Sequence, residues 1–293
     1  MEEKKQNVLL LIDASALIHR FFHALPPLTT PDGKPIQAVY GLTATLLKIF
    51  REQKPDYIVA ALDRPEPTFR EEKFKEYKIH RPAAEDALVA QIIQMPQVFG
   101  KFGIPTFDKA GFEADDIIGT IVEKFRTEEN LKIIILSGDL DVLQLVENDK
   151  VVAQIIKTGL TNFSIYNEEA VVQRYLLKPN QLVDYKGLIG DASDNIPGVK
   201  GIGPKTAAEL LKEFKTIEEI FDSITIIVPK TAKKLEGQRD IAFLSKELAT
   251  IKRDVLIGIE SLKELKVKPL AKKELTDYFS QLGFKSLIER LDA

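Results

Sequence analysis

Residues 8–13 read VLLLID, five apolar side chains followed by an aspartate. A short continuous apolar run of this kind is typical of a strand that is buried on both faces of a parallel sheet. Residues 57–63 (YIVAALD) and 132–139 (KIIILSGD) repeat the pattern, and each of them also ends on an aspartate. Amphipathic segments between these runs predict helices at 15–25, 39–51, 85–102 and 113–126. The alternation predicts an α/β fold, a mostly parallel central sheet with helices on both faces.

The pattern changes after about residue 166. No further strands are predicted there, and short helical segments with Gly and Pro between them surround residues 187–204. A last helix is predicted at 270–291. The chain has 293 residues, enough for two units, and we place the boundary near residue 180. Residues 1–180 are then the α/β unit and residues 181–293 a small helical unit.

Composition excludes several classes of protein. The chain contains no Cys and only three His, which removes disulfides, thiolate metal sites and cysteine nucleophiles and leaves little for a zinc hydrolase. Its apolar runs are far shorter than the roughly 20 residues of a membrane span, so we expect no membrane segment and a cytoplasmic location. The net charge of −3 argues mildly against a nucleic-acid partner when taken alone.

Acidic residues follow the ends of the predicted strands. Because the carboxyl ends of parallel strands meet at one edge of a sheet, Asp13, Asp63 and Asp139 are expected to lie close together. Each acid alone has an ordinary explanation as a turn residue or helix cap. Together they would repel one another unless cations neutralised them, and carboxylates without His or Cys favour Mg²⁺ or Mn²⁺. The candidate acids are Asp13, Asp63, Glu113, Asp115, Asp116, Asp139, Asp141, Asp191 and Asp194.

This number of carboxylates exceeds what one ion uses and suggests two ions, as in enzymes that displace groups at phosphorus. The acids therefore favour metal-dependent phosphodiester or phosphomonoester chemistry.

A glycine-rich stretch, residues 195–207 (NIPGVKGIGPKTA), precedes a predicted helix. Gly201 and Gly203 allow the main chain to approach a ligand closely, and Lys200 and Lys205 add positive charge beside the helix start. The spacing is not that of a P-loop, and an ordinary turn between helices is the alternative. A hairpin of this kind would hold a phosphate backbone without reading bases.

A basic segment, residues 64–82, follows the second strand. It interleaves Arg70, Lys78 and Arg81 with aromatic residues such as Tyr77, which suits a phosphate and a stacked base. Glutamates in the same segment leave open a solvated helix with ion pairs.

Six stretches together resemble the 5′-nuclease domain of bacterial DNA polymerase I, within the flap endonuclease family. The matching stretches are residues 11–15 (LIDAS), 68–70 (TFR), 77–81 (YKIHR), 113–116 (EADD), 137–141 (SGDLD) and 190–203 (GDASDNIPGVKGIG).

The resemblance implies a PIN-like nuclease unit with a helical arch at about residues 64–84 and a helix–hairpin–helix at about 187–214. It implies that the nine acids hold two Mg²⁺, for which Mn²⁺ substitutes, and that K⁺ binds at the hairpin. Lys78 and Arg81 on the arch and Arg70 at its base would be the catalytic cations. The implied DNA contacts are Arg20, Tyr77, Gly198, Lys200, Gly201, Gly203, Lys205 and Thr206.

The implied activity is that of a Mg²⁺-dependent 5′→3′ exonuclease and flap endonuclease, acting on 5′ ends, nicks and flaps of DNA and on RNA primers annealed to DNA. Replication and repair, a monomeric state, association with the nucleoid and a DNA polymerase partner in cis or in trans are expected with it. A non-catalytic branched-DNA-binding protein and a metal-dependent ribonuclease remain the alternatives. The turn at residues 64–67 (RPEP) departs from the family pattern and predicts a stiffer entry to the arch. A stand-alone enzyme and an excised domain are both compatible with the length.

Overall fold

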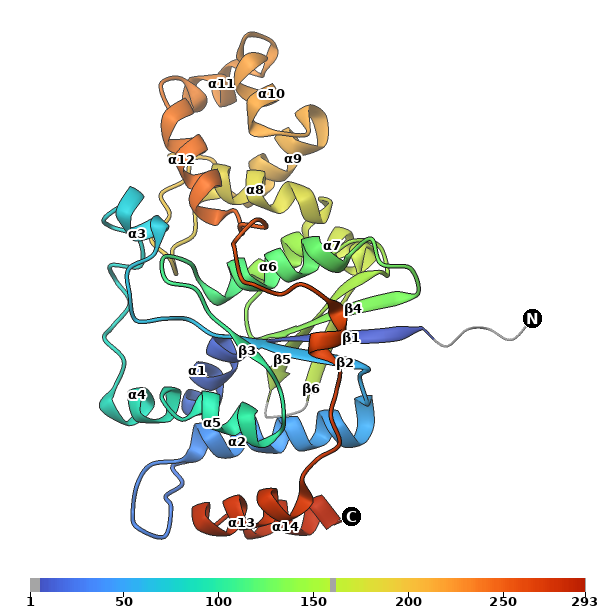
Figure 1. Ribbon diagram of the computed structural model, residues 1–293. Coiled ribbons are helices and arrows are strands. Elements are labelled where there is room, and N and C mark those ends of the chain that lie inside the picture. Colours follow the sequence, from blue (N-terminus) through green and yellow to red (C-terminus); the bar gives the residue numbers. More distant parts are fainter. Residues whose placement is uncertain (1–5, 159–161, 293) are drawn as a thin grey trace, which may run out of the picture.

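The computed structural model describes residues 6–158 and 162–292 of the chain. In this part, six strands form one sheet in the order β3-β2-β1-β4-β5-β6 (Figure 1). The strands β1 to β5 are parallel and β6 runs antiparallel to β5, so the predicted mostly parallel sheet is confirmed. Their bounds are β1 Asn7–Asp13, β2 Tyr57–Ala61, β3 Thr106–Phe107, β4 Leu131–Ser137, β5 Val151–Thr158 and β6 Asn162–Tyr166.

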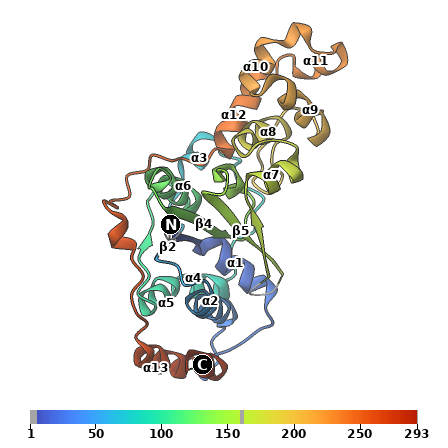
Figure 2. The same cartoon turned by 90° about the vertical axis from the view of Figure 1, so that its right-hand side faces the viewer.

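The apolar run of β1 is continuous because both faces of this central strand are covered. Leu10 and Ile12 pack into the apolar cluster on one side of the sheet, and Leu9 and Leu11 into the cluster on the other. Figures 1 and 2 show α6 over one face and the remaining core helices over the other. The helices of this unit are α1 Ala14–Ala24, α2 Gln37–Lys48, α4 Asp86–Ile92, α5 Met95–Lys101 and α6 Ala114–Phe125, with a π-helical turn η1 at Ile49–Gln53.

Two predicted helices differ from those observed. The segment 85–102 divides into α4 and α5, and Pro96 stands at the start of α5, where its missing N–H is tolerated. In the predicted arch, only α3, Phe69–Lys73, is helical, and turns follow it.

A small helical unit follows the sheet and has an apolar core of its own, which includes Leu188, Leu211, Ile217 and Leu235. Figure 2 places it at one end of the molecule. Its elements are η3 Pro179–Gln181, α8 Leu182–Ile189, α9 Pro204–Phe214, α10 Ile217–Asp222, η4 Ile224–Ile226, α11 Pro229–Leu235 and α12 Arg239–Ala249. The short 3₁₀ turn η2, Asp141–Leu145, and α7, Glu168–Tyr175, precede it, and Val171 of α7 packs in the apolar cluster under α6.

The C-terminal segment returns to the α/β unit, which differs from the expected single helical unit at 181–293. Ile251, Val255 and Leu265, the last of them in η5 Leu262–Leu265, join the apolar cluster under α6. Beyond them, α13 (Lys272–Leu282) and α14 (Lys285–Asp292) replace the predicted last helix, because Gly283 ends α13 at φ +76°. Their apolar side chains join the cluster that contains α1 and α2, so burial of apolar surface carries this segment back. No helix among the described residues is long and apolar enough to cross a membrane.

Candidate metal and nucleic-acid site

A cavity of about 280 Å³ opens at the carboxyl edge of the sheet. Seven of the nine predicted acids line it, although they come from residues 13 to 194 of the chain. These acids are Asp13, Asp63, Glu113, Asp115, Asp139, Asp141 and Asp194. We call this space the acid cavity. The strand-end acids are thus brought together as their positions predicted.

Local hydrogen bonds fix the strand-end carboxylates. Asp13 ends β1 and caps α1, accepting from the Ala16 N–H at 2.9 Å and from the Ser137 hydroxyl at 2.6 Å. Asp63 lies two residues beyond β2 and accepts from the Ala114 N–H at 2.7 Å. The Asp139 N–H donates to the Ser137 oxygen at 2.9 Å, so this serine joins two of the acids.

Burial and mutual repulsion disfavour the charged forms of several acids. Burial raises the pKa of Asp13 to about 7, and the negative charges of Asp63 and Asp139 raise it further. The hydrogen bonds from Ser137 and Ala16 lower this pKa but do not cancel the rise. Burial likewise raises the pKa of Asp141 to about 6, although Lys186 opposes the rise. The pKa of Asp115 lies well above its usual value because it is buried beside other carboxylates.

This donor set fits hard divalent cations, because it consists of carboxylate oxygens whose repulsion a cation relieves. Within residues 6–158 and 162–292, no three His, Cys, Asp or Glu side chains are already arranged to hold a metal ion.

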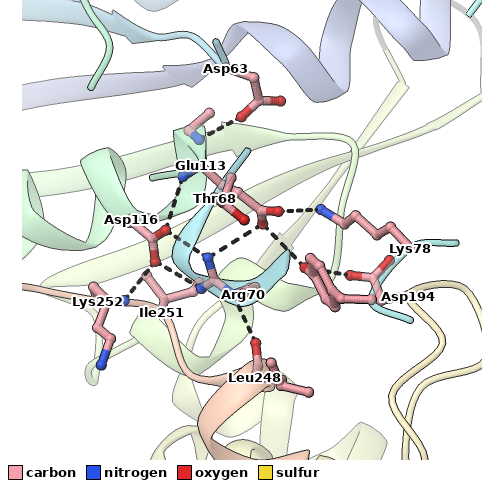
Figure 3. Close-up of polar contacts among 12 residues, drawn as sticks. Asp63, Thr68, Arg70, Lys78, Glu113, Asp116, Asp194, Leu248, Ile251 and Lys252 are labelled. Atoms are coloured by element: carbon pink, nitrogen blue, oxygen red, sulfur yellow. Dashed lines mark hydrogen bonds and ion pairs between the residues drawn. The ribbon is translucent and has the colours of Figure 1, made fainter. Parts of the chain in front are cut away.

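The arch segment lies against the acid cavity through three polar side chains. Lys78 Nζ is 2.7 Å from Glu113 Oε1, and Arg81 Nη2 is 2.5 Å from Asp194 Oδ1. The Tyr77 hydroxyl donates to both acids, at 3.3 Å to Glu113 and 3.2 Å to Asp194. Figure 3 shows Lys78 directed at Glu113. The predicted catalytic cations Lys78 and Arg81 therefore line the cavity, where they are paired with acids.

Arg70 lies at the base of the arch, as expected, and pairs there with Asp116. Both oxygens of Asp116 accept from Arg70, and they also accept from the backbone N–H groups of Glu113 and Lys252 (Figure 3). Asp116 is fully buried and its lone pairs are engaged, so the structure corrects its assignment as a metal ligand. Arg70, 2% exposed, reaches the cavity wall, but its donors are directed at Asp116 and the Leu248 carbonyl rather than at a substrate.

Lys186 on α8 is a site residue that the sequence reasoning missed. Its ammonium bridges Asp141 and Asp191, at 2.6 Å from Asp191 Oδ2. Asp191 thus contacts the other acids through this lysine and lies outside the wall of the acid cavity. No motif marked Lys186, and its only signal was a basic residue in the last turn of a helix next to an acidic loop. His19, on α1, also lines the acid cavity and was not predicted.

The glycine hairpin lies between α8 and α9. Gly198 does not face solvent, since its N–H donates to the Ser245 hydroxyl at 3.0 Å and a Cβ there would lie 2.2 Å from the Gly190 nitrogen. This corrects the expectation that Gly198 contacts DNA, because its role is close packing. Of the DNA contacts expected in the hairpin, Lys200, Gly201 and Lys205 are exposed, and Gly203 and Thr206 are partly exposed. Arg20, half-buried on α1, packs beside Gly138 at the cavity edge.

An acid cavity at the edge of a parallel sheet, lined by basic residues of an arch that itself contacts a glycine hairpin, defines a metal-dependent nuclease fold. The family model described as "5'-3' exonuclease, N-terminal resolvase-like domain" matches residues 8–176, and "5'-3' exonuclease, C-terminal SAM fold" matches residues 177–273. The chain belongs to the 5′-3′ exonuclease family.

Relatives in sequence include proteins of two lengths. DNA polymerase I of Caldicellulosiruptor bescii is 41% identical over 97% of this chain, but the chain covers 33% of that protein. DNA polymerase I of Bacillus subtilis is 39% identical over 99% of the chain and 33% of its own length. The chain thus spans about a third of these relatives. The 5'-3' exonuclease of Aquifex aeolicus is 34% identical over 98% of this chain and 96% of its own.

Solved structures share the fold. The T5 5'-exonuclease with bound zinc has a TM-score of 0.68 and 22% identity over 97% of both chains. The catalytic core of Rad2 in complex with DNA substrate has a TM-score of 0.65 and 17% identity, covering 98% of this chain and 92% of its own.

Proposed function

We propose that this protein hydrolyses phosphodiester bonds at 5′ ends, nicks and 5′ flaps of DNA, and in RNA primers annealed to DNA, using two Mg²⁺ ions. Mn²⁺ substitutes for Mg²⁺. The observation that carries the proposal is the convergence of seven carboxylates on one cavity whose wall also presents Lys78 and Arg81. Family membership and the metal-bound neighbour in the same fold support it.

The carboxylates that line the acid cavity would hold the ions, and the buried ones would give up their protons to do so. When bound, the ions supply Lewis acidity for an in-line displacement at phosphorus. Lys78 and Arg81 exchange their partners Glu113 and Asp194 for oxygens of the scissile phosphate, where their charge stabilises the transition state. Tyr77 moves with them, because its hydroxyl shares the same two acids.

The exposed part of the hairpin binds the duplex beside the cut through its backbone. Lys200 and Lys205 contact phosphates, which gives affinity that depends on salt and not on sequence. The Gly201 carbonyl accepts from the Lys234 ammonium at 2.7 Å. Backbone carbonyl oxygens of the hairpin would hold a K⁺ ion. The protein works as a monomer on nucleoid DNA in the cytoplasm.

A DNA polymerase is the expected partner. Relatives in which this region is a third of a DNA polymerase I support a partner in cis, and the relative of equal length supports one in trans.

Product analysis tests the proposal. A 5′-labelled flap, a nicked duplex and an RNA–DNA hybrid are each incubated with Mg²⁺, Mn²⁺ or EDTA. The proposal predicts 5′-phosphate products with either metal and none in EDTA. Binding of all three without cleavage would instead indicate a non-catalytic junction-binding protein, and cleavage of RNA strands alone a ribonuclease.

A further inference from the structure

A second cavity of about 580 Å³ adjoins the acid cavity. Gly138, Asp139 and Asp141 line both spaces, so these residues are a common wall. The second cavity lies where η2 meets α8 and the end of α7. Figure 2 shows α7 and α8 next to one another. None of the residues assigned above to the catalytic arch or to the exposed hairpin lines it.

Aromatic and apolar side chains form most of its other wall. Tyr175 and Tyr185 meet edge to face, with ring centroids 6.0 Å apart, and both are half-buried. Leu182 and Ile189 of α8 lie beside them. Lys186 lies at the boundary with the acid cavity, where its ammonium bridges Asp141 and Asp191. The second cavity therefore has aromatic rings and apolar side chains on one side. On the other side the Lys186 ammonium lies between Asp141 and Asp191.

The rim of this cavity leads to the hairpin. Residues 190–193 line the cavity, and the Asp191 N–H donates to the Ile196 carbonyl at 2.8 Å. Gly198, at the base of the hairpin, packs against Gly190. The rim therefore connects the hairpin with the wall that the two cavities share.

We propose that the second cavity, which we call the tyrosine cavity, binds the base of a nucleotide that flanks the cleaved phosphodiester. The inference rests on the proposed function and adds a subsite to it. Its volume lies in the range of small-molecule sites, and its aromatic and apolar wall suits a base. The acids and Lys186 lie together on the side that adjoins the acid cavity, where the cleaved phosphodiester would lie. Stacking on tyrosine accepts every base because each has a π-face, so the subsite is indifferent to sequence.

Abasic substrates test the tyrosine cavity. One series of 5′ flaps carries a tetrahydrofuran residue in place of the nucleotide on either side of the cleaved bond. The wild-type kcat/KM falls on the order of tenfold for one of the two positions, as expected for the loss of one stacked base. Tyr185→Leu keeps apolar bulk against the helical core but removes the ring. This variant is slower on the natural flap and loses nothing further on the abasic one.

Controls separate the subsite from general effects. Tyr185→Phe retains the ring and keeps the wild-type ratio, as does Leu256→Ala at a side chain that is 85% exposed. Kd values in EDTA, measured by fluorescence anisotropy, show the same loss of abasic discrimination in Tyr185→Leu. If Tyr185→Leu does not fold, Tyr175→Leu replaces it.

Two results would overturn the proposed subsite. One is that the wild-type protein cleaves the natural flap and both abasic flaps equally well. The other is that kcat/KM of the leucine variant still falls on the abasic flap as much as that of the wild type. The proposed function fails separately, if the wild-type protein cleaves none of the substrates.

Discussion

Arg70 and Asp116 form a bidentate ion pair that is closed to solvent, with Nη1–Oδ2 and Nη2–Oδ1 distances of 2.7 and 2.8 Å. The pair joins the start of the arch to the first turn of α6. Arg70 also donates to the carbonyls of Leu248 and Thr250, so a single guanidinium connects three segments of the chain.

Asp116→Asn should therefore destabilise the fold. The substitution leaves the Arg70 charge buried without its partner, which typically costs about 3–5 kcal/mol. Urea unfolding in EDTA measures the loss. Glu66→Gln, which breaks an exposed pair with Arg64, is the control and should cost about 1 kcal/mol or less. An Asp116→Asn loss no larger than that of the control would contradict this role. If the folded Asp116→Asn protein showed no rise in Tm with Mg²⁺, Asp116 would be a metal ligand.

Asp115→Asn should have the opposite effect on stability. Its pKa is raised well above the usual value by burial and by neighbouring acids, so the charged form opposes folding at neutral pH. We expect a higher Tm in EDTA at pH 8, a smaller rise with Mg²⁺, and no flap cleavage with DNA affinity largely kept. Calorimetry and a cleavage assay check these expectations. Asp277→Asn, at an exposed position of α13, is the matched control. Cleavage at the wild-type rate would refute the ligand assignment.

The stabilisation by Mg²⁺ should depend on pH. The pKa of Asp13 is raised to about 7 and that of Asp141 to about 6, both above the unfolded value of 3.8. Because the fold raises the pKa values of these two acids, the metal-free protein becomes more stable as the pH falls through 7 and 6. This gain in stability is complete below pH 3.8. Because protons and ions compete for the same oxygens, Mg²⁺ should raise the Tm more at pH 8 than at pH 5.5. Equal rises at the two pH values would mean that these acids are not the ligands.

Lys78→Ala should affect the chemical step more than binding. Lys78 is directed at Glu113 inside the acid cavity, with Nζ 2.7 Å from Oε1, rather than at the outer surface of the molecule. We expect single-turnover cleavage to slow by about 100-fold or more, with Kd for the flap changed by a few-fold. Lys75→Ala, at an exposed position of the same segment, is the control. Equal losses in rate and affinity would assign Lys78 to binding alone.

The local sequence pattern was sufficient to predict a strand where all of its residues lie in the same environment. The run at residues 8–13 is apolar because neighbouring strands and both helical layers cover it, and its closing aspartate follows from the sheet edge. β3 has only two residues, and β5 carries Gln154 within its apolar run, so neither gave a clear strand pattern.

Roles that depend on distant partners could not be predicted. The spacing of Glu113 and Asp116 is the same for a metal ligand and for a helix cap, and only the approach of Arg70, 46 residues away, separates the two. Lys186 likewise acquires its role from Asp141, which lies 45 residues before it. The return of residues 251–291 to the sheet depends on apolar faces that the helical unit leaves unused.

Anomalous diffraction from crystals grown with Mn²⁺ shows directly whether divalent ions bind in the acid cavity. We expect two manganese peaks within this cavity, each with oxygens of the carboxylates that line it within coordination distance, and no peak beside Asp116. Crystals of protein that cleaves flaps in the same Mn²⁺ buffer, yet shows no peak in this cavity, would contradict this expectation.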